Sequence, residues 1–154
     1  MSKTLPKILI VEDDFPLFGE MEKCLQSHAL GRDINIGVIY AHNLVDARQK
    51  IMTYRIDIVS TDMTYPVRDK ELNEEAGAML VPFVRRRISP QTATIVYSGH
   101  ELGDIKSKLE KHGIIENVMQ GSKLKNIYPT ILKKDPQMSH DTWARAVLDA
   151  VMAL

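Results

Sequence analysis

The chain has 154 residues, enough for one compact domain and too few for two ordinary ones. Its 20 lysines and arginines balance 20 aspartates and glutamates, so the charge gives no reason to expect nucleic acid or membrane as the main partner. No apolar run is long enough to span a bilayer, and the first residues lack the apolar core of a signal peptide, which favours a cytoplasmic protein.

Short apolar runs alternate with helical patterns along the chain. Residues 7–11 form a β-branched run typical of a strand that is buried on both faces. Further strands are predicted over 34–40, 56–61, 92–97 and 117–119. Helices are predicted over 17–28, 44–52, 77–87, 102–109 and 140–154, with Asn43 and Ser139 as caps and with Pro82 expected to kink or delay the third helix.

Five strand–helix units in one short chain predict an α/β fold in which a doubly wound parallel sheet carries helices on both faces, because parallel strands need crossover connections. We expect a single domain over residues 1–154, with five strands in the flavodoxin-like order 2-1-3-4-5. In such sheets the functional residues gather at the carboxyl ends of the strands.

Acidic residues stand at two of those ends. Glu12, Asp13 and Asp14 follow the first strand, and Asp62 follows the third. In the predicted order these strands are neighbours, so their carboxylates would converge and repel unless a cation neutralised them. Magnesium suits such a site because it is a hard ion that takes oxygen ligands.

Two further residues complete a set suited to phosphoryl transfer. A carboxylate can be the nucleophile that forms an aspartyl-phosphate, while an ammonium group such as Lys123 and a hydroxyl such as Ser98 stabilise the transferred group. Each residue alone has an ordinary explanation: Asp14 as a helix N-terminal acid, Ser98 as a turn serine and Lys123 as a solvated lysine. None of these separate explanations accounts for the finding that residues of these types follow four different predicted strands.

These motifs resemble the receiver domain of two-component response regulators, a CheY-like family, over nearly the whole chain. The matching segments are residues 7–14, Asp62-x-x-x-Pro66, residues 93–99 and Lys123. The resemblance implies that Asp62 is the phosphoacceptor, with Ser98 as the switch hydroxyl and Lys123 as the conserved lysine. It also implies that Mg²⁺ is bound by Asp13, Asp62 and the Thr64 backbone carbonyl, and by Glu12 through water.

The sequence departs from that family at two positions and in two loops. Gln120 stands three positions before Lys123, where receivers usually carry an aromatic residue, and Leu124 replaces the usual proline. The two loops, over residues 66–77 and 124–138, are longer than is usual in that family. The second would reshape the face that receivers commonly use for dimers and partners, so we do not predict the usual dimer.

Some polar residues have weaker assignments. Thr64 and His100 lie two positions beyond a site residue, where receivers tune the lifetime of the phosphoryl group, and a surface-turn role for His100 is equally compatible with the sequence. The five histidines lack metal-ligand spacing. Cys24, the single cysteine, excludes an internal disulfide and a thiolate cage, and we expect it to be a small buried hydrophobe.

Three functions remain open. The first is a phosphorylation-dependent signalling receiver that takes its phosphoryl group from a histidine kinase or phosphotransfer protein. Apart from its self-catalysed phosphoryl transfer and slow dephosphorylation, it would have no enzymatic activity. It would act on a protein partner, without an output domain of its own. The second is a receiver-shaped interaction module that phosphorylation does not control. The third is a phosphatase of the haloacid dehalogenase type, which is disfavoured because Thr64 stands where that family needs a second acid.

Overall fold

The structure is a computed structural model that describes residues 5–116, 119–120, 123–124, 127–135 and 139–154. Among the helices in these ranges, none combines the length and the apolar character that crossing a membrane requires.

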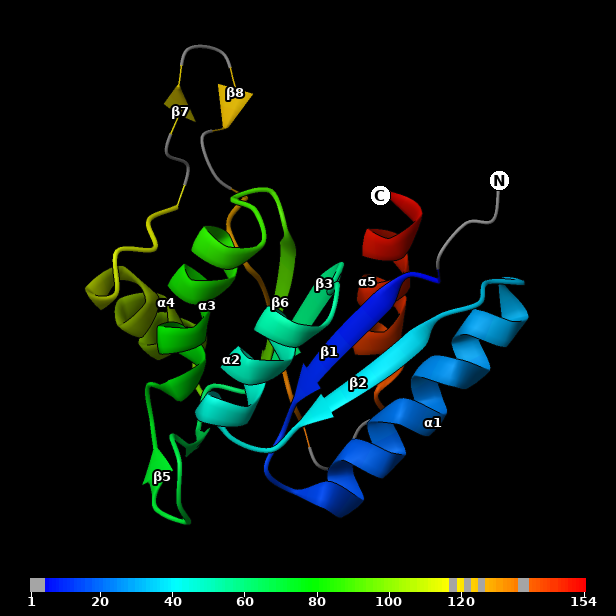
Figure 1. Cartoon of the computed structure of the whole chain (residues 1–154), viewed down its shortest axis with the longest axis horizontal. Coiled ribbons are helices and arrows are strands. Elements are labelled where there is room, and N and C mark those ends of the chain that lie inside the picture. Colours follow the sequence, from blue (N-terminus) through cyan, green and yellow to red (C-terminus); the bar gives the residue numbers. More distant parts are fainter. Residues whose placement is uncertain (1–4, 117–118, 121–122, 125–126, 136–138) are drawn as a thin grey trace.

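The centre of the molecule is a five-stranded parallel sheet (Figure 1). Its strands are β1 (Lys7–Val11), β2 (Gly37–Ala41), β3 (Ile58–Thr61), β6 (Ala93–Ser98) and β9 (Thr130–Lys133). They lie in the order β2-β1-β3-β6-β9, which is the predicted order 2-1-3-4-5. Every neighbouring pair is parallel, so the carboxyl ends of all five strands share one edge of the sheet.

Helices cover both faces of the sheet (Figure 1). On one face, α1 (Phe15–Gly31) packs beside α5 (Asp141–Met152), and the core there contains Ile8, Ile10 and Trp143. On the other face lie α2 (Leu44–Thr53), α3 (Ala76–Arg87) and α4 (Leu102–Lys111). Odd and even strand residues thus enter different cores, as expected for strands buried on both faces.

Local sequence signals explain where several helices begin and end. The side chain of Asp14 accepts a hydrogen bond from the amide of Leu17 at the start of α1, and Asn43 caps α2 through the amide of Asp46. The helix-terminal role expected for Asp14 is therefore confirmed. The third helix is continuous from Ala76 to Arg87 although it contains Pro82.

The fifth strand differs from the prediction. Residues 117 and 118 lie outside the described residues, and Met119 belongs to β7 (Met119–Gln120), which pairs with β8 (Lys123–Leu124) in a separate two-stranded sheet. The strand that joins the main sheet is β9, inside the segment predicted to be the loop 124–138. The prolines suggested a loop, but Pro129 directly precedes β9, a position at an edge strand where proline is tolerated.

The other enlarged segment, residues 66–77, contains a small hairpin. β4 (Tyr65–Pro66) and β5 (Leu72–Asn73) pair in an antiparallel sense between β3 and α3. The hairpin loop is held against the start of α2, because the carbonyls of Val67 and Arg68 accept hydrogen bonds from the Val45 amide and the Asn43 side chain.

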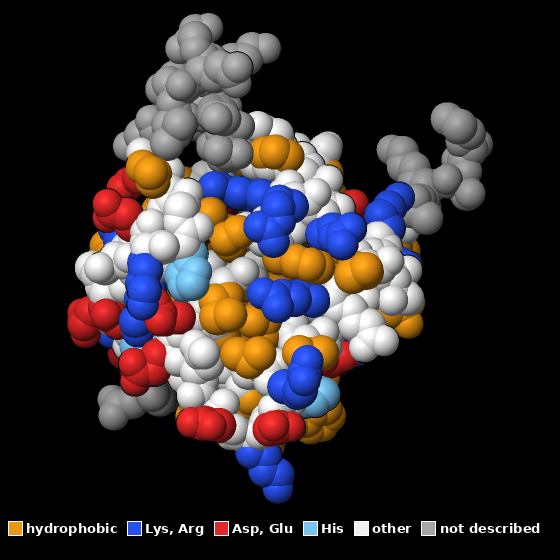
Figure 2. All heavy atoms as spheres, turned by 60° about the vertical axis from the view of Figure 1, so that its left-hand side comes forward, with side chains coloured by type: hydrophobic (Ala, Val, Ile, Leu, Met, Phe, Trp, Pro, Cys, Tyr) orange, Lys and Arg blue, Asp and Glu red, His pale blue; other side chains and the backbone are white. Residues whose placement is uncertain are grey.

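The outer face around α3 and α4 mixes hydrophobic with Lys and Arg side chains (Figure 2). On the neighbouring α2–α3 surface, the guanidinium groups of Arg48 and Arg87 lie 5.4 and 5.8 Å from the ring centre of Phe83. Cationic side chains therefore cover part of the apolar surface of these two helices.

Candidate functional site

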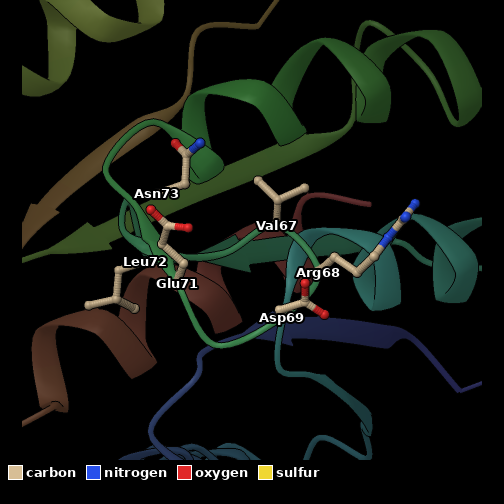
Figure 3. A pocket seen from close by; sticks show the side chains of 6 residues that line it. All are labelled: Val67, Arg68, Asp69, Glu71, Leu72 and Asn73. Atoms are coloured by element: carbon tan, nitrogen blue, oxygen red, sulfur yellow. The ribbon is translucent and has the colours of Figure 1, made fainter.

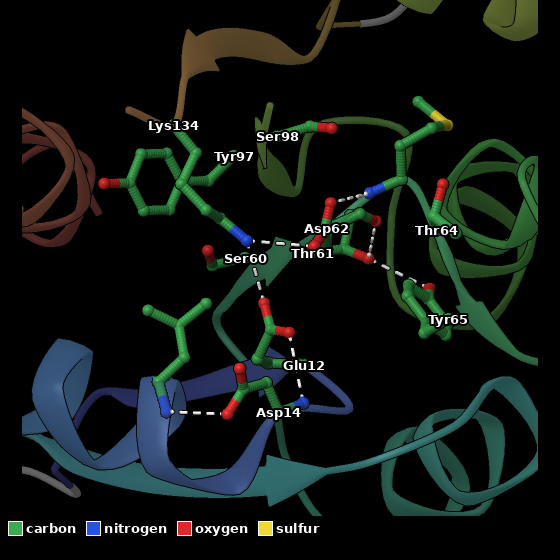
Figure 4. Close-up of polar contacts among 12 residues, drawn as sticks. Glu12, Asp14, Ser60, Thr61, Asp62, Thr64, Tyr65, Tyr97, Ser98 and Lys134 are labelled. Carbon is green, nitrogen blue, oxygen red and sulfur yellow. Dashed lines mark hydrogen bonds and ion pairs between the residues drawn. The ribbon is translucent and has the colours of Figure 1, made fainter. Parts of the chain in front are cut away.

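Three charged side chains meet at the carboxyl edge of the sheet (Figure 4). Glu12 directly follows β1, Asp62 directly follows β3 and Lys134 directly follows β9. The Lys134 Nζ atom lies 2.9 Å from Glu12 Oε2 and 2.9 Å from Asp62 Oδ2. Of the acids predicted to converge, Glu12 and Asp62 do so, with a lysine bridging them.

That lysine is Lys134, so the assignment of Lys123 to the end of the fifth strand is wrong. Lys123 lies in β8, which is outside the main sheet. The error follows from choosing residues 117–119 as the fifth strand. A usable signal was present, because the apolar pair Ile131–Leu132 is followed by two lysines.

Glu12 is almost fully buried, with 3% of its side chain exposed. Burial raises its pKa to about 7 and is the largest effect; Lys134 lowers the pKa, while the nearby Asp62 raises it. The amide of Asp14 also donates a hydrogen bond to Glu12 Oε1. Near neutral pH this carboxyl group is therefore close to its point of half-protonation.

Lys134 stays charged in this environment. Burial lowers the pKa of its ammonium group, but attraction to Asp62 and Glu12 outweighs burial and the net shift is upward. Its Nζ atom also lies 5.4 Å from the ring centre of Tyr97, on β6. The side of the sheet that carries Tyr97 faces α5, as its stacking on Trp143 shows.

Asp62 is held from both sides. Its Oδ1 atom accepts a hydrogen bond of 2.6 Å from the Met63 amide, and its Oδ2 atom accepts from Lys134. The start of α3 lies close to the backbone of Asp62 and Met63. A Cβ atom on Gly77 would lie 2.9 Å from the Met63 Cα atom and nearer still to the Asp62 carbonyl oxygen. Glycine at position 77 therefore permits the backbone path that sets Asp62 at the sheet edge.

The oxygen donors at this edge fit a hard divalent cation. Asp62 is partly accessible, with 16% of its side chain exposed, and Asp13, next to the buried Glu12, is exposed to solvent. Asp14 is engaged as the helix cap of α1. With one lysine facing two carboxylates and Asp13 close by in sequence, the cluster carries more acidic groups than cations, as a Mg²⁺ site requires.

Thr64 and His100 are in direct contact. The Thr64 Oγ1 atom lies 2.8 Å from His100 Nε2, and His100 Nδ1 lies 3.6 Å from Asp104 Oδ2. The two residues come from the segments after β3 and β6, and their contact spans the sheet edge beside Asp62. The sequence placed both near the site, but it gave no sign that they bond to each other.

Ser98 is fully buried at the end of β6, in the neighbourhood of Asp62 (Figure 4). Its Oγ atom accepts a hydrogen bond of 3.2 Å from the His100 amide. Ser98 therefore helps to shape the turn that carries His100.

The residue three positions before the bridging lysine is Ile131, not Gln120. Gln120 lies in β7, while Ile131 is a half-buried residue of β9. A hollow of about 190 Å³ lies here between α4 and β9, lined by residues that include His100, Ile105 and Ile131. The departure from the receiver pattern thus remains, but with an aliphatic residue at the position concerned.

A second hollow, of about 370 Å³, lies in the β4–β5 hairpin loop (Figure 3). It is lined by Val67, Arg68, Asp69, Glu71, Leu72 and Asn73. Its lining contains none of the residues predicted for the phosphoryl site, so it is a feature of the hairpin itself.

Comparison with solved structures identifies the fold. No family model matches the chain, and no curated protein matches it. Its structural neighbours, however, are response regulator receiver domains of the CheY-like kind at low sequence identity. The chain therefore has the receiver-domain fold, as the motifs indicated.

Three of these neighbours illustrate the likeness. A two-component response regulator from Clostridium difficile is 14% identical with a TM-score of 0.65, over 96% of this chain and 96% of that one. The chemotaxis protein CheY4 of Vibrio cholerae is 15% identical with a TM-score of 0.65, over 96% and 99%. A CheY-like receiver domain protein from Methanospirillum hungatei is 16% identical with a TM-score of 0.60, over 97% and 93%.

Proposed function

We propose that this protein is a phosphorylation-dependent signalling receiver in which Asp62 accepts a phosphoryl group from a phosphohistidine. The donor would be a histidine kinase or a phosphotransfer protein. The observation that carries the proposal is the position of Lys134, which bonds Asp62 and Glu12 at 2.9 Å each at the carboxyl edge of a receiver-type sheet.

The chemistry assigns each side chain a task. An Asp62 oxygen attacks the phosphorus, the phosphorus–nitrogen bond of the donor breaks, and its electron pair returns to the imidazole ring. Lys134 holds a positive charge beside the oxygens of the transferred group, where charge stabilisation does most of the work in phosphoryl transfer. The Met63 amide, 2.6 Å from Asp62 Oδ1, fixes the orientation of the carboxylate.

The oxygen donors support Mg²⁺ as the metal. Asp13 and Asp62 would bind it directly, with the Thr64 backbone carbonyl as a further ligand and with Glu12 acting through water. The ion would supply positive charge for the oxygens of the phosphoryl group. Because Glu12 has a pKa of about 7, its proton would be displaced more readily above neutral pH than below it.

Phosphorylation of Asp62 would affect the adjoining surface through the ends of β6 and β9. A phosphoryl group on Asp62 would draw Lys134 and the Ser98 hydroxyl toward it, so the equilibrium of the adjoining surface would shift. The hollow beside Ile131 lies on that route, between α4 and β9. A protein partner that reads this surface is the expected output.

Intact mass after incubation with acetyl phosphate and Mg²⁺ tests the proposal. We expect one added phosphoryl group on the wild type and none on Asp62→Asn. Asp69→Asn is a matched control, because Asp69 is an exposed carboxylate in the nearby β4–β5 loop. Equal labelling of the wild type and Asp62→Asn would contradict the proposal.

The same samples separate the other two functions. A folded protein that stays unlabelled by acetyl phosphate and by a phosphohistidine donor, and that binds its partner equally well as Asp62→Asn, would be an interaction module. Sustained hydrolysis of a phosphate ester that Asp62→Asn loses would indicate a phosphatase. Ile131 in place of an aromatic residue is the observation that favours the interaction module.

A further inference from the structure

A second cluster of possible metal ligands lies where α1 and α5 touch. Cys24 and His28 are four residues apart on α1, a spacing that puts two side chains on the same face of a helix. Asp141, the first residue of α5, faces them: its Oδ1 atom lies 3.5 Å from Cys24 Sγ and 2.7 Å from His28 Nε2. The sequence separates Asp141 from Cys24 by 117 residues, so spacing alone did not reveal the cluster.

We propose that Cys24, His28 and Asp141 bind a Zn²⁺-like transition-metal ion. One ligand atom from each residue lies within 4.8 Å of the other two, and each of the three residues is partly buried. A metal at their centre would replace the hydrogen bond between His28 and Asp141, which already holds both groups in place. Three protein ligands with one position left for water is a common arrangement for zinc.

The surroundings orient the carboxylate toward such an ion. Ser139 donates a hydrogen bond of 2.8 Å to Asp141 Oδ2, so Oδ1 is left to face α1. Outer partners of this kind set ligand orientation and strengthen metal binding.

The ligand types decide which metal fits. Thiolate, imidazole and carboxylate together favour borderline-soft ions such as Zn²⁺ and Co²⁺, whereas Mg²⁺ requires oxygen ligands. The α1–α5 cluster and the carboxylates around Asp62 would thus select different metals. Because the ligands come from two helices, a bound ion would fasten α1 to α5. This inference is independent of the function proposed for Asp62.

Titration of reduced, metal-free protein with Co²⁺ tests it, because a cobalt–thiolate bond gives a charge-transfer absorption band that oxygen and nitrogen ligands do not. We expect one Co²⁺ per chain to produce this band and Zn²⁺ to abolish it by displacement. Cys24→Ser should lose the band. Loss of a residue that only orients a ligand weakens metal binding by about 10- to 100-fold. His28→Gln and Asp141→Asn each remove a direct ligand, so they should weaken Co²⁺ binding by more than that.

Two controls make the result specific. His42→Gln removes a histidine that contacts Asp46, which lies four residues further along the chain, in α2. The single cysteine lies on α1, so this variant should leave the band unchanged. Asp62→Asn should also leave it unchanged, so a failure at the phosphoryl site would not affect this test. A band that persists in Cys24→Ser, or Co²⁺ binding that is as tight in both His28→Gln and Asp141→Asn as in the wild type, would overturn the proposal. Absence of the band from folded wild-type protein would overturn it as well.

Discussion

Lys134 Nζ lies 2.9 Å from Asp62 Oδ2, although 72 residues separate the two in the chain. The contact exists because β3 and β9 flank β6 in one parallel sheet, so residues that follow each strand emerge at the same edge. The same ammonium group also bonds the buried Glu12. One lysine therefore balances two carboxylates, and the properties of the site depend on it.

Replacing Lys134 by methionine should impair the site while keeping most of the side-chain volume. We expect phosphorylation by acetyl phosphate to slow by about 10- to 100-fold, because the positive charge beside the transferred oxygens is lost. Stability should also fall, by about 3 kcal/mol, because two carboxylates would remain close together without their cation. Labelling rates from intact mass and unfolding by urea measure the two effects.

Lys123→Met and Lys133→Met are the matched controls. Lys123 lies in the separate β7–β8 sheet, and Lys133 pairs with the exposed Glu101. Both variants should label at the wild-type rate. A slow Lys123→Met with a normal Lys134→Met would restore the assignment that the sequence first suggested.

Glu12→Gln should change how stability depends on pH. The folded-state pKa of Glu12, about 7, lies above its ordinary value of 4.5, so the carboxyl group favours the fold while it is protonated. This contribution is fully present below about pH 4.5 and is lost as the pH rises through 7. The free energy of unfolding of Glu12→Gln, relative to wild type, should therefore increase from pH 5 to 8.

Between pH 5 and 8, the free energy of unfolding of Glu12→Gln relative to wild type should rise by on the order of 1–3 kcal/mol without added metal. Urea unfolding of both proteins at several pH values measures it, and the difference between them cancels the other titrating groups. A constant difference across this range would show that Glu12 does not titrate there.

Much of the fold was readable from the sequence because its signals are local. The buried run 7–11, the caps Asp14 and Asn43, and the alternation of strands and helices all reflect short-range preferences. The strand order was expected from the flavodoxin-like fold class and is confirmed. The fifth strand was misplaced because β9 is a short edge strand with only two consecutive apolar residues, behind a proline. An inserted segment that contains β7 and β8 precedes it and carries a competing apolar pattern.

The acidic part of the candidate site was predictable from the sequence, but its lysine and its side-chain contacts were not. Glu12 and Asp62 directly follow strands that are easy to recognise, so their approach could be inferred. Lys134 was missed because the apolar pair before it, Ile131–Leu132, is a weak strand signal, and the pairing of β9 with β6 is what places Lys134 at the sheet edge. The contacts between Thr64 and His100, and between Cys24 and Asp141, join distant segments and depend on how the helices and loops pack.

Gly77→Ala should disturb the support beneath Asp62. A methyl group there would collide with the backbone of Asp62 and Met63, which cannot move aside as a flexible side chain could. We expect a loss of about 1–3 kcal/mol in unfolding free energy, together with slower labelling of Asp62.

Gly19→Ala is the control for that substitution. Gly19 lies within α1, with open space around its Cα atom, so alanine there should raise stability by about 0.5–1 kcal/mol. If the two variants had the same stability, the close approach of α3 to Asp62 would not constrain position 77.

His100→Ala should shorten the lifetime of the phosphorylated form. His100 bonds Thr64 beside the site, and its removal would open that side to water. We expect decay to accelerate several-fold, and Thr64→Val, which deletes the hydroxyl that His100 contacts, should act in the same direction. The loss of the added mass with time measures both rates.

His112→Ala serves as the reference, because this half-buried histidine contacts Glu75, outside the set of residues assigned to the phosphoryl site. Its decay rate should match the wild type. Decay in His100→Ala at the wild-type rate would assign His100 a surface role and remove it from the site.

The most direct measurement is to identify the residue that carries the phosphoryl group. Borohydride reduces an aspartyl-phosphate to homoserine, so peptide mass spectrometry of reduced protein locates the modified position. We expect homoserine at position 62, dependent on Mg²⁺ and on Lys134. Homoserine at position 13 or 14 instead, or unmodified peptides from folded protein treated with acetyl phosphate and with a phosphohistidine donor, would contradict it.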